Sequence, residues 1–117
     1  TVLTERIMSN ALYYYEPRLL GHEGTLHALK EWLRDDNFFV VNGDTISNVD
    51  YSEMKSQHRN GTISVLYDQW RCAGTWIYAK EYFINKNLPV IPYRPLGLEW
   101  RDIGTTERLK EAEEFYK

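Results

Sequence analysis

Two aspartates, Asp44 and Asp102, stand where carboxylates could hold a divalent cation. Asp44 follows the apolar run Phe38–Val41 and the dipeptide Asn42-Gly43, and Asp102 comes just ahead of the helix expected at the C-terminal end of the chain. Oxygen ligands are the ones that Mg²⁺ prefers, and the carboxyl ends of strands are where α/β sheets bind ligands. The pair therefore suggests a metal site. The alternative is that Asn-Gly-Asp is only a turn, since this composition is common in turns.

The segment that must position Asp44 has the composition of a buried central strand. Phe38 to Asn42 is aromatic and β-branched, and it ends abruptly in the turn. A helical pattern precedes it, beginning at about Gly24, because Leu26, Leu29 and Leu33 share one helix face. Asp35-Asp36-Asn37 ends this pattern, so a helix followed by a strand leads directly to Asp44.

Further elements are expected on both sides of this unit. Asp50 and Glu53 have the spacing of a capping box, and Thr105 or Thr106 can cap the C-terminal helix, which places Asp102 just ahead of a helix N-terminus. The sequence predicts helices over 3–9, 50–58 and 106–117, one helical turn over 81–85, strands over 11–15, 62–67 and 72–78, and an extended edge segment over 90–93. This order predicts an α/β fold with a mixed sheet.

Length and composition set limits on the class of protein. A chain of 117 residues forms one domain with a real core, and its net charge of −3 comes from interspersed charges without a Lys/Arg cluster. We therefore expect no binding to nucleic acid or to a membrane surface. Cys72 is the single cysteine, and the sequence has no signal segment and no apolar run of membrane-spanning length, so we expect a cytoplasmic location.

Four stretches, in order along the chain, resemble one family. They are Tyr15–Leu26 with its Leu20-Gly21 and Gly24-Thr25-Leu26, Val41-Asn42-Gly43-Asp44, Cys72–Tyr78 with Ala73-Gly74, and Trp100-Arg101-Asp102-Ile103-Gly104-Thr105. They are similar to motifs of the sugar-phosphate nucleotidyltransferases, the nucleoside-diphosphate-sugar pyrophosphorylases. Each motif is weak by itself, but the shared order over nearly the whole chain makes the resemblance specific.

The resemblance implies a Rossmann-like nucleotidyltransferase fold, with a mixed, mostly parallel sheet flanked by helices. It implies an enzyme that transfers a nucleotidyl group from a nucleoside triphosphate to a sugar 1-phosphate and releases pyrophosphate. Asp44 and Asp102 would be the catalytic residues and would hold Mg²⁺, which neutralises and orients the two phosphate-bearing substrates. The residues implied in nucleotide or substrate binding are Glu16, Leu20, Gly21, Gly24, Thr25, Asn42, Gly43 and Gly74.

The family's N-terminal glycine-rich phosphate loop has no counterpart in this sequence, because no two of the seven glycines are adjacent. Residues 1–117 are therefore expected to form a single, partial nucleotidyltransferase-like domain, truncated at its N-terminal side, either as a fragment or as a naturally short relative. Two other functions remain open. One is a non-catalytic module that binds a nucleotide sugar or a subunit, and the less favoured one is a glycosyltransferase. If strands are missing beside Phe38–Asn42, its edge would seek a partner, which predicts a homo-oligomer.

Overall fold

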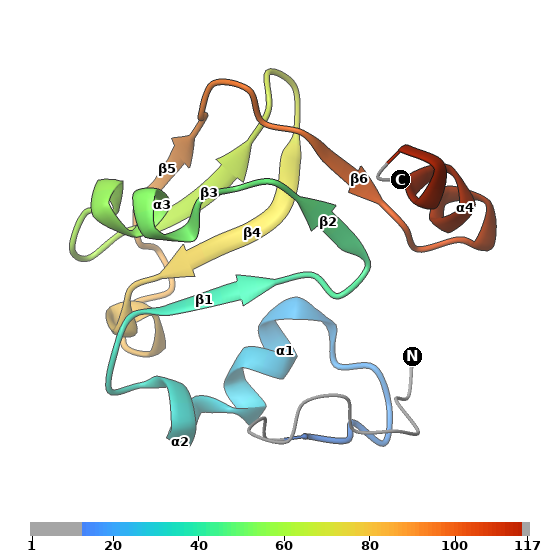
Figure 1. Ribbon diagram of the computed structural model, residues 1–117. Coiled ribbons are helices and arrows are strands. Elements are labelled where there is room, and N and C mark those ends of the chain that lie inside the picture. Colours follow the sequence, from blue (N-terminus) through green and yellow to red (C-terminus); the bar gives the residue numbers. More distant parts are fainter. Residues whose placement is uncertain (1–12, 116–117) are drawn as a thin grey trace.

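Within residues 13–115, which the computed structural model describes, the central sheet has four strands in the order β1-β4-β3-β5 (Figure 1). Their bounds are Phe38–Val41 for β1, Cys72–Tyr78 for β4, Ile63–Tyr67 for β3 and Val90–Tyr93 for β5. Strand β4 runs antiparallel to both of its neighbours, whereas β3 and β5 are parallel. Two short strands, β2 (Thr45–Ser47) and β6 (Trp100–Asp102), pair antiparallel in a second, smaller sheet.

Helices cover both faces of the central sheet. The described helices are α1 (Gly21–Ala28), α2 (Lys30–Leu33), α3 (Tyr51–Gln57), the 3₁₀ turn η1 (Lys80–Phe83) and α4 (Thr106–Phe115). On one face, Leu26 of α1 packs with Val65 of β3. On the other face, Met54 of α3 packs with Leu66, and neither of these two side chains is exposed at all. Alternation along β3 thus supplies both halves of the core, and burying a side chain such as Leu66 contributes roughly 2 kcal/mol.

The predicted helix starts and the predicted sheet edge agree well with the structure. Asp50 caps α3, where its Oδ1 accepts the backbone N–H of Glu53 at 3.1 Å. Thr105 caps α4 in the same way, because its Oγ1 accepts the backbone N–H of Arg108 at 3.1 Å. The proline-containing strand β5 lies at an edge of the central sheet, as predicted.

The expectation of a mostly parallel sheet was wrong. Of the four strand pairs in residues 13–115, only β3 with β5 is parallel. The physical reason is the tight reversal between β3 and β4, closed by the backbone N–H of Asp68 donating to the carbonyl of Arg71 at 3.1 Å, since such a turn joins only antiparallel strands. What the structure does show is a mixed α/β fold.

Strand β1 was expected at the centre of the sheet, and it lies instead at an edge of the sheet described in residues 13–115. Its only partner there is β4, with Phe38 opposite Tyr78 and Val41 opposite Thr75. One face of β1 is also incompletely covered, because Phe39 is 37% exposed and Val41 is 47% exposed. The apolar run is a half-buried strand with two exposed members.

Several other boundaries differ from expectation. Residues 13–15 form no strand, whereas the remainder of the expected strand over 11–15, the expected helix over 3–9 and the last two residues of the C-terminal helix lie outside the described residues. Helix α1 begins at Gly21, earlier than the Gly24 start that the leucine spacing indicated, and Gly21 has a φ of +75° that suits glycine. Strands β2 and β6 were not predicted. No helix in residues 13–115 is long and apolar enough to cross a bilayer.

His58, which ends α3, should make stability depend on pH. Its Nδ1 lies 2.6 Å from Ser64 Oγ of β3, and burial lowers the pKa of His58 below its ordinary value. As the pH falls, the imidazole of His58 is therefore protonated at a higher pH in the unfolded chain than in the folded one. The free energy of unfolding should consequently fall as the pH drops below about 6.5. Urea denaturation at about pH 7.5 and about pH 5 should show this loss, and the His58→Asn variant should lose less. An equal loss in the variant would contradict the assignment.

Candidate functional site

The small sheet brings Asp44 and Asp102 together. Strands β2 and β6 pair so that Thr45 lies opposite Asp102, and the backbone N–H of Ile103 donates to the carbonyl of Asp44 at 2.7 Å. Both side chains face Gly104: a Cβ there would lie 3.0 Å from Asp102 Oδ1 and 3.2 Å from Asp44 Oδ2. The two carboxylates therefore converge on Gly104, whose lack of a side chain lets both of them lie close to it.

Gly74 of β4 brings the turn that carries Asp44 against the central sheet. The backbone N–H of Asn42 donates to the carbonyl of Gly74 at 2.9 Å. The backbone N–H of Thr45 donates to the carbonyl of Asn42 at 3.4 Å. Gly74 has a φ of +75°, and a Cβ on it would lie 2.9 Å from Thr45 Oγ1. Only glycine permits this approach. Gly43 lies at the open tip of the turn, with no atom within 4 Å of where its Cβ would be.

Arg108 of α4 contacts one of the two aspartates. Its Nη1 lies 2.6 Å from Asp102 Oδ2, and the other oxygen of Asp102, Oδ1, accepts the backbone N–H of Gly104 at 2.7 Å. The ion pair is open to water, since the side chains of Arg108 and Asp102 are 55% and 42% exposed. Exposed pairs of this kind are weak, about 0.2–1 kcal/mol, so Arg108 can leave Asp102 at little cost.

The site is anchored to the β3–β4 turn through Trp100 of β6. The indole Nε1 of Trp100 donates to Asp68 Oδ2 at 2.8 Å, and the backbone N–H groups of Trp70 and Arg71 donate to Asp68 Oδ1 at 2.7 and 2.8 Å. These donors, Trp70 first, hold the pKa of Asp68 below its ordinary value, so the carboxylate stays charged at neutral pH. Trp100 also packs with the core cluster around Leu66.

Asn48 provides a second anchor, where the chain leaves β2. Its side-chain amide donates to the carbonyl of Gly97 at 3.0 Å, and its side-chain oxygen accepts the backbone N–H of Glu99 at 2.9 Å. Its backbone N–H donates to the carbonyl of Glu99 at 3.1 Å. One asparagine thus extends the pairing of β2 with the segment that leads into β6.

The remaining predicted binding residues form a separate group at the start of α1. The Glu16 carboxylate accepts hydrogen bonds from the Thr25 hydroxyl and, at 3.4 Å, from the backbone N–H of Leu20. Gly24 lies against Leu20, whose Cβ would be 2.8 Å from a Cβ at position 24. The group containing Glu16, Leu20, Gly21, Gly24 and Thr25 is therefore held together by its own contacts, which shape the beginning of the helix.

His22 connects α1 to the central sheet. Its Nε2 lies 3.0 Å from the hydroxyl of Tyr78, and its ring packs edge-on against Trp76 with the ring centroids 4.8 Å apart. Burial, followed by the nearby Tyr82 and Glu23, raises the pKa of Tyr78 to about 12, so this phenol is neutral under physiological conditions. The histidine has a packing and hydrogen-bonding role in this arrangement.

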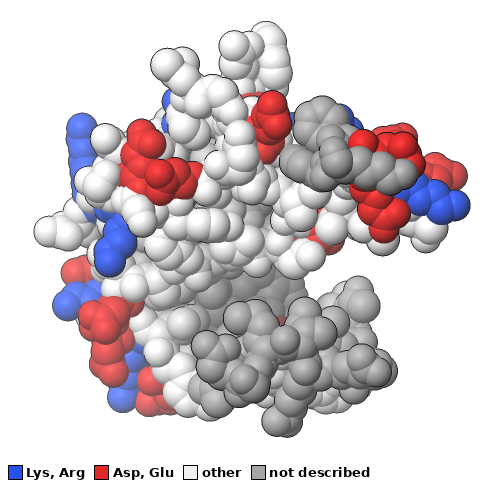
Figure 2. All heavy atoms as spheres, viewed as in Figure 1, with Lys and Arg blue, Asp and Glu red and all other residues white. Residues whose placement is uncertain are grey.

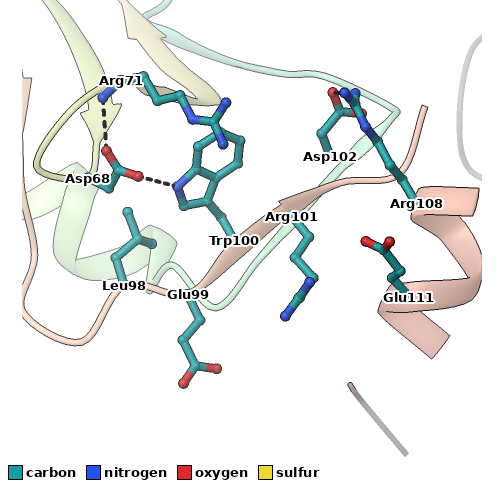
Figure 3. A pocket seen from close by; sticks show the side chains of 9 residues that line it. All are labelled: Asp68, Arg71, Leu98, Glu99, Trp100, Arg101, Asp102, Arg108 and Glu111. Atoms are coloured by element: carbon teal, nitrogen blue, oxygen red, sulfur yellow. Dashed lines mark hydrogen bonds and ion pairs between the residues drawn. The ribbon is translucent and has the colours of Figure 1, made fainter. Parts of the chain in front are cut away.

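A pocket of about 530 Å³ adjoins Asp102 (Figure 3). Side chains from the β3–β4 turn, β6 and α4 line it: Asp68, Arg71, Leu98, Glu99, Trp100, Arg101, Asp102, Arg108 and Glu111. Figure 3 shows Trp100 and Asp102 on one side of β6, and Glu99 and Arg101 extending to the other, as strand alternation requires. The guanidinium of Arg71 lies over the Trp100 ring, 4.6 Å from its centroid.

Sequence reasoning missed Arg108, Trp100, Asp68 and Asn48 as parts of this site. Arg108 carried a usable signal, since it lies in the first turn of the predicted helix that follows Asp102. The other three act through partners that are distant along the chain, and no local pattern indicates such contacts.

The two converging carboxylates fit a hard divalent cation. Within residues 13–115, no group of three or more His, Cys, Asp or Glu residues could hold a metal ion. Asp44 and Asp102 would therefore supply two ligands, and water or substrate oxygens would complete the shell, as is usual for Mg²⁺. Gly104 allows both carboxylates to lie close to its backbone, because a side chain there would crowd Asp102 Oδ1 and Asp44 Oδ2.

Charges are mixed over the surface that surrounds the site. Figure 2 shows acidic and basic side chains interspersed on this face, with both signs on the α4 end. The visible face carries no extended area of one sign among the described residues.

Comparisons with known proteins show the fold alone. No protein-family model matches the chain, and no curated protein sequence matches it significantly. Among solved structures, the chain is similar to the crystal structure of HddC from Yersinia pseudotuberculosis, with a TM-score of 0.68 and 16% sequence identity. The similarity covers 87% of this chain and 65% of the HddC chain, so this chain spans about two-thirds of the length of HddC. The chain therefore has the α/β fold of the corresponding part of HddC.

Proposed function

We propose that this chain is part of a sugar-phosphate nucleotidyltransferase, with a Rossmann-like nucleotidyltransferase fold and a magnesium site at Asp44 and Asp102. The convergence of these carboxylates on Gly104 is the observation that carries the proposal. Both aspartates belong to motifs that resemble those of the family, and the similarity to HddC supports a shared fold.

In the proposed reaction, an oxygen of a sugar 1-phosphate attacks the α-phosphorus of a nucleoside triphosphate, and the bond to pyrophosphate breaks. When bound, Mg²⁺ would neutralise charge on the two substrates and orient them. The task of Asp44 and Asp102 is to hold that ion, and the task of Gly104 and Gly74 is to keep both carboxylates in position. The attacking phosphate is already ionised near neutral pH, so the chain needs no general base.

A direct assay tests the proposal. The chain should release pyrophosphate from at least one nucleoside triphosphate when Mg²⁺ and a series of sugar 1-phosphates are present, and EDTA should stop the release. If the folded chain turns over none of the common nucleoside triphosphates, it does not act as an independent enzyme. If the chain binds Mn²⁺ but releases no pyrophosphate, the metal site is present and catalysis requires residues outside this chain.

The exposed edge of β1 favours a second candidate function, a non-catalytic subunit module. One backbone edge of this strand has no partner in residues 13–115, and unpaired strand edges readily accept another strand. We propose on the same grounds that the chain forms a homo-oligomer. A monomer in light scattering over a wide concentration range would count against it.

A further inference from the structure

We propose that Arg108 is the phosphate-binding residue of the metal site. In the metal-free chain it neutralises Asp102, and when a divalent cation binds between Asp44 and Asp102 it leaves that carboxylate and binds phosphoryl oxygens in the adjoining pocket. This inference rests on the proposed function, because it assumes the metal site. The ligand class is a phosphate group, contributed either by a sugar phosphate or by a polyphosphate.

Competition at Asp102 is the first step. Arg108 Nη1 already lies 2.6 Å from Asp102 Oδ2, while Oδ1 is bonded to the backbone N–H of Gly104. A cation held by both Asp44 and Asp102 needs an oxygen that is engaged in these contacts. The guanidinium is the partner that can leave, since the ion pair is exposed to water whereas the Gly104 amide is fixed in the backbone.

The pocket provides the place to which Arg108 can move. Arg108 lines it together with Arg71, and Figure 3 shows both side chains on the same side of β6 as Asp102. Arg71 is held in place by stacking on the Trp100 ring. Two planar guanidinium groups that line one pocket are well suited to a phosphate, because each can donate two parallel N–H bonds to its oxygens.

The acidic residues of the pocket do not cancel this preference. Asp68 uses both of its oxygens for the Trp70 and Arg71 amides and the Trp100 indole. Glu99 extends to the opposite side of β6 in Figure 3. Once the cation holds Asp102, Glu111 of α4 remains as a further carboxylate of the pocket, and Arg71 and Arg108 together outweigh its single charge.

The test uses opposite effects of one substitution, Arg108→Gln. Without phosphate, this variant should bind Mn²⁺ about two- to fivefold more tightly than the original chain, since the competing cation is gone. With saturating Mn²⁺, it should bind inorganic phosphate about tenfold more weakly, because a charge-assisted donor is lost. Calorimetry measures both affinities. Repeating the second titration with the Mn²⁺ complex of inorganic triphosphate shows which source of phosphate depends on Arg108.

Lys110→Gln is the matched control, since it removes the same charge from an exposed position of the same helix. It should change neither affinity by more than about twofold, as expected for a distant screened charge. If Arg108→Gln binds Mn²⁺ and phosphate as the control does, the role of Arg108 is refuted while the metal site stands. If the original chain binds no more Mn²⁺ than an Asp44→Ala variant, the proposed function fails and this inference fails with it.

Discussion

Replacing Asp44 by alanine should abolish Mn²⁺ binding and lower any nucleotidyl transfer by at least about 100-fold, since losing a residue that merely supports a metal ligand already costs about 10- to 100-fold. The reason is geometric: Asp102 alone offers one carboxylate, and Arg108 already occupies one of its oxygens. Stability should change little, because Asp44 is exposed and exposed substitutions stay within about 0.5 kcal/mol. Calorimetric Mn²⁺ titration and a pyrophosphate-release assay measure the two effects.

Asp35→Ala is the control for this substitution. Asp35 is also an exposed aspartate, but it lies in the turn ahead of β1. Its loss removes the same charge and should leave Mn²⁺ affinity within about twofold, since screening weakens distant charges. Unchanged Mn²⁺ binding in Asp44→Ala would show that the convergence at Gly104 is not a metal site.

Replacing Gly74 by alanine should destabilise the fold by about 3 kcal/mol. Roughly 1–2 kcal/mol comes from forcing a Cβ into the left-handed conformation at φ +75°. The rest comes from overlap, because the new Cβ would lie 2.9–3.2 Å from three atoms of Thr45. Thermal unfolding should shift downward by on the order of 10 °C. Mn²⁺ binding should weaken as well, since Thr45 follows Asp44 directly.

The variant Gly61→Ala separates the cost of the left-handed backbone conformation from the cost of the overlap with Thr45. Gly61 has nearly the same backbone conformation, with a φ of +71°, but nothing lies within 4 Å of where its Cβ would be. It should show only the conformational cost of about 1–2 kcal/mol. Thr45→Gly should partly rescue Gly74→Ala, because it removes the atoms that clash. Equal losses at Gly74 and Gly61 would mean that the close approach of β4 to β2 is unimportant.

Local patterns were sufficient to predict most of the elements. The capping residues Asp50 and Thr105 predicted the starts of α3 and α4, because an N-cap depends on residues within one turn. The edge position of β5 followed from Pro92, which cannot donate a ladder hydrogen bond. Such features depend on neighbours along the chain, and the sequence displays them directly.

Pairing between distant segments could not be predicted in this way. Strands β2 and β6 are three residues each, too short for a periodic pattern, and exist because Thr45–Ser47 meets Trp100–Asp102. The edge position of β1 likewise depends on which strands flank it, which its apolar composition does not show. Asp44 and Asp102 were identified by their positions after a strand and ahead of a helix, and then by the resemblance, but their convergence on Gly104 became apparent only from the structure.

The attachment of the small sheet has a consequence for fluctuations of the native state. Both carboxylates are carried by the short β2–β6 ladder and its ends, which are joined to the core by the Gly74 approach, the Trp100–Asp68 hydrogen bond and the packing of Trp100 beside Leu66. Such a unit can open locally without unfolding β3 and β4, and amide hydrogens within it would then exchange through that opening. An ion bound only to the closed form would suppress the opening in proportion to its concentration. The metal would therefore govern the lifetime of the small sheet while leaving the core unaffected.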